Sequence, residues 1–188
     1  MLFRSFAGVA LLAGCTGQSS SDSPVAAPAG VSVRDATGEI TARVVAGRPC
    51  RAMVEGIELQ IGADPLVAMV GNVRWDGVET PKATMLLRNG VRAAELVTDD
   101  GKLQINDDKG IPVIRSRIEG ETAPVLDAAN TNVRTAKRSG TNVTIGDMTV
   151  TGTQDLLLAA LLTAHELGPE VRALAACHRL LLLQKSAP

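Results

Sequence analysis

Residues 105–147, INDDKGIPVIRSRIEGETAPVLDAANTNVRTAKRSGTNVTIGD, contain an internal repeat. Apolar residues and aspartates recur at intervals of 20 residues, namely Ile105, Val125 and Ile145, and Asp107, Asp127 and Asp147. Gly120 and Gly140 keep the same spacing, as do Gly90 and Gly110, and Asn130, which also tolerates positive φ, stands where a third glycine would fall. A unit of this length holds two short strands and two tight turns, so the repeat predicts a β-meander or a small stack of sheets. Chance recurrence of Gly and Asp in a hairpin-rich chain is the alternative.

The chain before the repeat also has the pattern of short strands separated by turns. Alternating or continuous apolar runs predict strands at Ile40–Val45, Ile57–Ile61, Leu66–Val70 and Met85–Leu87. Turn residues between them lie at Gly62–Pro65, Asp76–Gly77 and Asn89–Gly90. We therefore expect a β-rich region over residues 34–152.

The C-terminal part changes to a helical pattern. Residues 154–167 predict a helix with Thr153 as its N-cap, and Pro169 suits the first turn of a second helix. The first helix is apolar nearly all round, so it is buried in a core, docked on a partner or placed against lipid. The second has one apolar face, formed by Val171, Leu174, Ala175, His178, Leu181 and Leu182. The predicted fold is mainly β (α+β): a short-hairpin β-meander with a helical pair, residues 153–185, packed on it.

The N-terminus has the features of an export signal. Arg4 precedes a short apolar run that ends in Leu12-Ala13-Gly14-Cys15. These four residues resemble the lipobox of bacterial lipoproteins. The resemblance implies that residues 1–14 are a signal peptide and that Cys15 becomes the lipidated first residue. An ordinary signal peptide, or an N-terminal helix of a cytosolic protein, is the alternative.

The resemblance also implies a location and a class of protein. Two or three acyl chains on Cys15 anchor a protein stably to a membrane. Thr16, where an Asp would favour retention in the inner membrane, points to the outer membrane facing the periplasm. Residues 15–33, rich in Ser, Ala, Pro and Gly, predict a flexible linker between this anchor and the domain. We expect a binding or scaffold protein with an envelope protein as partner; an immunity or exclusion lipoprotein and an envelope hydrolase are the alternatives.

Two further cysteines bear on the fold. An even pair of cysteines in an exported protein is typical of a disulfide, so Cys50 and Cys177 are predicted to bond. The bond would join the start of the folded domain to the C-terminal helix. Two buried thiols that never meet are the alternative.

Composition argues against several classes of function. The chain has 19 basic and 20 acidic residues, without the basic excess of a nucleic-acid binder. Removal of residues 1–14 would leave Trp75 as the one aromatic side chain besides two histidines, because the chain has no Tyr and both Phe residues precede Cys15. Stacking platforms for single-stranded nucleic acids and for sugars usually need several aromatic residues.

Catalytic and metal-binding patterns are weak. His165-Glu166 begins like a zinc-binding helix motif, but Pro169 stands where the second His belongs. His178 follows Cys177, which cannot act as a nucleophile if it is in a disulfide. The repeated aspartates lack the dense carboxylates of a calcium loop, and Asx turns explain them. We expect neither an enzyme nor a metal or cofactor.

One group of basic residues is a candidate site for an anionic partner. It consists of Arg115, Arg117, Arg134, Lys137 and Arg138. Arg117 and Lys137 lie one repeat apart, so they could share a sheet face and bind lipid head groups or an acidic protein. A solvated face balanced by Glu119 and Glu121 is the alternative.

Overall fold

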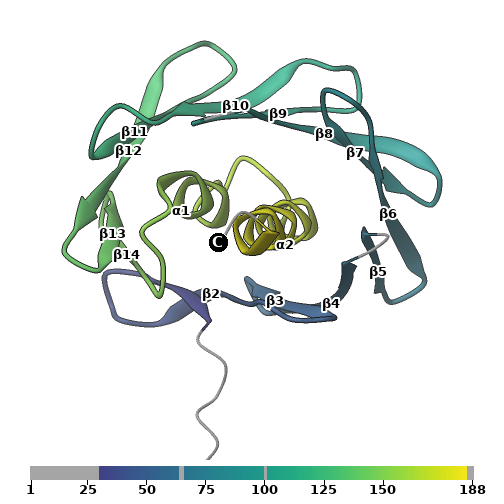
Figure 1. The fold of residues 1–188 in the computed structure, drawn as a ribbon, viewed down its shortest axis with the longest axis horizontal. Helices are drawn as coiled ribbons and strands as arrows, with labels where there is room; N and C mark the ends of the chain where they lie inside the picture. Colours follow the sequence, from purple (N-terminus) through teal and green to yellow (C-terminus); the bar gives the residue numbers. More distant parts are fainter. Residues whose placement is uncertain (1–29, 64–65, 100, 186–188) are drawn as a thin grey trace, which may run out of the picture.

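The protein is a closed antiparallel β-barrel with two helices inside it (Figure 1). The computed structural model describes residues 30–63, 66–99 and 101–185. The strands are β1 (Val31–Arg34), β2 (Ile40–Val45), β3 (Cys50–Val54), β4 (Ile57–Ala63), β5 (Leu66–Val70), β6 (Val73–Glu79), β7 (Thr84–Arg88), β8 (Val91–Asp99), β9 (Lys102–Asn106), β10 (Pro112–Arg117), β11 (Thr122–Leu126), β12 (Asn132–Ser139), β13 (Asn142–Ile145) and β14 (Met148–Thr151). The helices are α1 (Leu156–Leu162) and α2 (Pro169–Lys185).

Each strand pairs with its neighbours in sequence, and the pairing of β1 with β14 closes the ring. Val33 lies opposite Val150 at this closure. The mainly β prediction with two C-terminal helices is confirmed. The expected meander is in fact a complete up-and-down barrel, which leaves each of these strands paired on both sides.

The core lies inside the barrel because the strands alternate between apolar and polar residues. On β3, Cys50, Ala52 and Val54 are buried, whereas Arg51 between them is exposed. The residues one repeat apart follow the same rule: Ile105, Val125 and Ile145 are fully buried on β9, β11 and β13. This inward apolar side is what the two helices cover.

The turns of the repeat share one hydrogen-bonding scheme. The Asp107 carboxylate accepts from the backbone N–H groups of Lys109 and Ile111, and the Asp127 carboxylate accepts from those of Ala129 and Thr131. Asp35 caps the β1–β2 loop in the same way. Asx turns therefore account for these aspartates.

Helix α1 is core, which decides between the three environments that its apolar surface allowed. Each of its residues is at most 1% exposed, and it contacts β10, β11, β12 and β13 from inside the barrel. It is shorter than predicted, and its N-cap is Asp155, whose carboxylate accepts from the Leu158 N–H. Thr153 instead accepts from the Asp155 N–H and supports the cap from outside.

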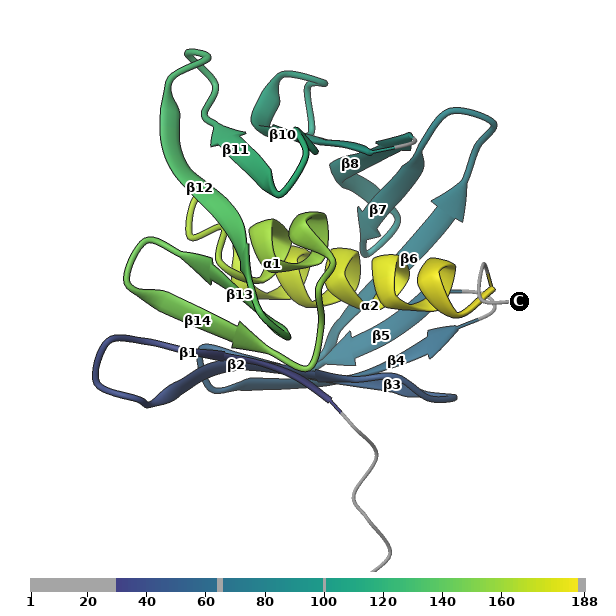
Figure 2. The ribbon, with the colours of Figure 1, turned by 60° about the vertical axis from the view of Figure 1, so that its left-hand side comes forward.

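Helix α2 is also buried on more than one face. Residues 172–178 are all buried, so the single apolar face predicted for this helix was too narrow. The helix crosses the barrel interior (Figure 2) and contacts β2, β3 and β4. The predicted disulfide is present: Cys50 on β3 and Cys177 on α2 are bonded, with 1.98 Å between the sulfurs.

Two local predictions were wrong. Asp76 and Gly77 lie inside β6 rather than in a turn, because the Leu66 side chain packs where Gly77 has no side chain. The β-rich region also begins before residue 34, since Val31 and Val33 of β1 are core residues, at 3% and 1% exposed. The composition of residues 15–33 concealed this short strand. The predicted signal peptide, Cys15 and the linker up to residue 29 lie outside the described residues.

Candidate functional site

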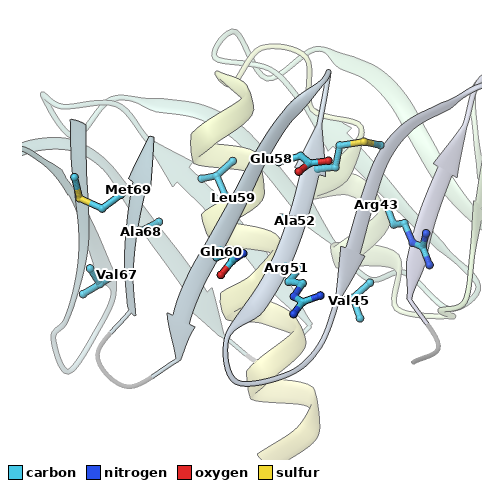
Figure 3. Close-up of a pocket in the computed structure, with 11 residues that line it drawn as sticks. Arg43, Val45, Arg51, Ala52, Glu58, Leu59, Gln60, Val67, Ala68 and Met69 are labelled. Atoms are coloured by element: carbon cyan, nitrogen blue, oxygen red, sulfur yellow. The ribbon is translucent and has the colours of Figure 1, made fainter. Parts of the chain in front are cut away.

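A half-open groove of about 830 Å³ lies on the outer face of β2–β5. Its side walls carry outward side chains: Arg43, Val45, Arg51, Met53, Glu58, Gln60, Val67 and Met69. The buried residues Ala52, Leu59 and Ala68 form its floor. Figure 3 shows the groove crossing neighbouring strands, with α2 behind them. We call this feature the outer groove.

The register of the strands sets the order of these side chains. Arg43 lies opposite Met53, and Met53 lies opposite Glu58, which forms one row across β2, β3 and β4. The next row places Arg51 opposite Gln60. Residues diagonal to one another on a sheet face are within reach of long side chains. Cationic, amide, carboxylate and thioether groups therefore alternate along the groove.

Both arginines of the outer groove have free guanidinium groups. Within the described parts of the chain, neither Arg43 nor Arg51 has a hydrogen-bond or ion-pair partner. The next cation along the wall differs, because Arg74 is 2.8 Å from Asp76 and this bond raises the pKa of the Arg74 guanidinium. With Glu58 as the one carboxylate of the lining, the groove carries a net positive charge.

The chain enters the barrel beside this groove. A Cβ placed on Gly30 would lie 2.9 Å from the Val45 side chain and 3.6 Å from Nε of Arg43. Gly30, the first described residue, therefore lies at the edge of the outer groove.

The five basic residues predicted from sequence occupy two different environments. Arg134 binds the Glu166 carboxylate with both terminal nitrogens, at 2.9 and 2.5 Å, and Arg138 pairs with Glu121 at 2.9 Å. Arg115 donates to the Asn130 side chain. Arg117 and Lys137 are exposed on β10 and β12, with β11 between these strands. All five residues therefore lie on β10 or β12, but their side chains do not form one cluster.

A charged cluster closes one end of the barrel. Glu55, in the β3–β4 turn, accepts from Arg172 of α2 at 2.5 Å and contacts His165 at 3.1 Å. These hydrogen bonds, with Arg172 first, hold the pKa of the Glu55 carboxyl below its usual range. The Arg172 side chain is 2% exposed. Burial acts to raise the pKa of Glu166, but the hydrogen bond from Arg134, a backbone hydrogen bond and the charges of Arg134 and His165 together leave that pKa lowered. Both ion pairs hold the α1–α2 connection to the barrel.

His178 lies on α2 and faces β6 and β7, but it lacks the geometry of a catalytic triad. Its Nε2 is 3.3 Å from Thr84 Oγ1 and 3.8 Å from a Glu79 carboxylate oxygen, while Nδ1 has no partner among the described residues. A triad needs the hydroxyl and the carboxylate on opposite ring nitrogens. Burial lowers the pKa of His178, although Glu79 opposes this effect. The other candidate pair, Cys177 beside His178, has no free thiol.

The described residues contain no group of three or more His, Cys, Asp or Glu side chains placed to hold a metal ion. Neither described helix is long and apolar enough to cross a membrane.

Sequence reasoning missed Arg43 and Arg51 as site residues. The signal was present in part, because the alternation in Ile40–Val45 already placed Arg43 on the outer face. A hairpin turn at Glu55-Gly56, both at positive φ, sets the register that brings Arg51 opposite Gln60.

The architecture defines a class: an up-and-down barrel whose interior holds its own C-terminal helices and whose outer wall carries a cationic groove. Comparison with known proteins adds no relative, since no protein-family model, curated protein or solved structure matches this chain.

Proposed function

We propose that this protein is a lipid-anchored binding protein of the bacterial envelope, held at the outer membrane through Cys15 and facing the periplasm. The outer groove is the observation that carries the binding function, because two guanidinium groups line it without any internal partner in the described chain. Unpaired arginines in a concave site are suited to carboxylate or phosphate ligands. The lipobox resemblance of Leu12-Ala13-Gly14-Cys15 supports the anchor.

The barrel supports a binding role rather than turnover. The described strands leave no free edge that a partner strand could join. The two helices occupy the interior, and the disulfide holds α2 there. A partner must then use outward side chains. Charged residues on the outer face, such as Arg51 and Glu58, also favour a barrel surrounded by water and tethered beside a membrane.

The anchor is tested by mass spectrometry of the mature N-terminus in the native chain and in Cys15→Ala. We expect a diacylglyceryl cysteine at the N-terminus of the native protein and an uncleaved, unlipidated chain in the variant. Gln18→Ala, which leaves Cys15 intact, is the control and is expected to be lipidated. An unmodified Cys15 in the native protein would overturn the anchor.

The binding role is tested by crosslinking in intact envelopes followed by co-purification. A protein partner that is recovered with the native chain and lost with Cys15→Ala is the expected result. Equal recovery with both chains would show that attachment to the membrane has no part in binding.

A further inference from the structure

We infer that the outer groove binds an extended acidic segment of a partner protein, with Arg43 and Arg51 taking its carboxylates. This inference deepens the proposed binding function and rests on it for the location of the partner. The lining of the outer groove is chemically more varied than a simple anion site requires.

The polar lining matches a peptide more fully than it matches a free phosphate. Arg43 and Arg51 provide donors for carboxylates. The Gln60 amide can both donate to and accept from a peptide backbone, and the Glu58 carboxylate can accept a backbone N–H. A phosphate ion would use the two guanidiniums but offers no backbone N–H to Glu58 and no backbone amide to Gln60.

The apolar lining has the same implication. Met53 lies between Arg43 and Glu58 in their row, and Met69 on β5 is 55% exposed although it is a large apolar residue. Methionine side chains adapt to varied apolar partners because they are unbranched and polarizable. Every second side chain of an extended peptide faces the same way, so apolar residues two positions away from a carboxylate would pack against these two methionines.

The shape of the site separates a peptide from a membrane surface. The groove is a hollow of about 830 Å³, within the range of roughly 300–1,000 Å³ typical of ligand sites. A flat bilayer surface would contact the outward side chains of the walls and would leave the floor of Ala52, Leu59 and Ala68 uncovered. A single extended chain can follow the hollow across β2–β5.

The position of Gly30 gives this site a place relative to the proposed anchor. Gly30 adjoins Arg43 and Val45, and Cys15 precedes it by 15 residues. An extended segment of that length reaches at most about 50 Å. The partner segment would therefore belong to a protein that is exposed close to the same membrane.

The test is fluorescence anisotropy with the full-length chain purified in a zwitterionic detergent. The probe is a labelled heptapeptide in which glutamate and valine take turns at every second position, with serines between them, so that both face the groove. The matched peptide carries glutamines instead of glutamates. We expect binding of the acidic peptide that weakens with added salt, and at least about tenfold weaker binding of the uncharged peptide.

Variants locate the binding site. Arg43→Gln combined with Arg51→Gln is expected to weaken binding of the acidic peptide about tenfold, since two partly exposed ion pairs are lost. Glu58→Gln is expected to strengthen binding about twofold, because it removes a like charge. Lys82→Gln combined with Arg88→Gln is the matched control: it removes two exposed cations outside the groove and is expected to leave the affinity unchanged.

Each contrary result overturns the inference. Equal loss in the groove and control variants would show that net charge drives binding. Binding of phosphatidylglycerol vesicles that depends on Arg43 and Arg51, without peptide binding, would identify lipid head groups as the occupant. Thermal unfolding of the variants controls for folding, because these outward side chains should not alter the melting temperature. The assay needs no lipid on Cys15. If the chain proves to be unlipidated but binds the peptide, the lipid-anchored envelope function is refuted and the groove assignment stands.

Discussion

Removing the disulfide should destabilise the barrel by an amount that the topology sets. Cys50 and Cys177 are separated by 127 residues, so their bond closes a loop that includes nearly all of the described chain. In the chain-entropy model, closing a loop of this length costs the unfolded state about 5 kcal/mol. Cys50→Ala combined with Cys177→Ala should therefore lower the free energy of unfolding by roughly 3–5 kcal/mol, or the melting temperature by about 10–20 °C.

The assay is urea denaturation followed by circular dichroism, with native protein in reductant as a second arm. Both sulfurs lie in fully buried residues, so the folded native protein should resist reduction until denaturant opens the barrel. Once reduced, it should unfold at the same urea concentration as the double variant, apart from the volume lost in the alanine side chains. A loss of less than about 1 kcal/mol in both arms would refute the argument that this loop constrains the unfolded chain.

Three further perturbations follow from individual contacts. The pKa of His178 is lowered in the folded protein, so the unfolded chain binds more protons. Stability should therefore fall as the pH drops below about 6.5. Denaturation at several pH values should show this slope, and His178→Gln should remove it. Glu55→Ala should cost about 1–3 kcal/mol in chemical denaturation, since it leaves the buried Arg172 without its carboxylate; Glu121→Ala, which removes an ion pair at a 71% exposed carboxylate, should cost less than about 1 kcal/mol. Gly77→Ala should cost about 1–3 kcal/mol of stability, because the added Cβ would lie 2.5 Å from Leu66 Cδ2. In thermal melts, the double variant with Leu66→Ala should lose less stability than the two single variants add up to. Strict additivity would contradict the steric explanation.

The features that were predictable from sequence are those in which neighbouring residues carry the information. Alternation placed Ile105, Val125 and Ile145 on one side of their strands, and all three are buried. The pairing of Cys50 with Cys177 was predicted from an even pair of cysteines together with the expectation of export, and the two residues are bonded. In both cases the signal depends on residue type and spacing alone.

Closure of the barrel could not be predicted in this way. It depends on contacts such as Val33 with Val150, whose partners are almost the whole domain apart in sequence and are selected by the accumulated twist of the intervening strands. The Asp76–Gly77 dipeptide shows the same limitation on a smaller scale. Asp and Gly are typical of turns, but both residues lie in β6, where the Leu66 side chain of the neighbouring strand packs above Gly77.

The outer groove was predictable only in part, because its strand registers are local whereas its shape depends on the whole fold. Each hairpin register is local, so the approach of Arg51 to Gln60 could in principle be read from the turn at Glu55-Gly56. The hollow itself depends on how β2–β5 curve around α2 (Figure 3). A barrel that pairs its own edges and encloses its own C-terminal helices has to recognise other molecules through outward side chains. Arg43 and Arg51, left unpaired beside the point where the chain enters the barrel, are therefore where we expect selection for binding to act.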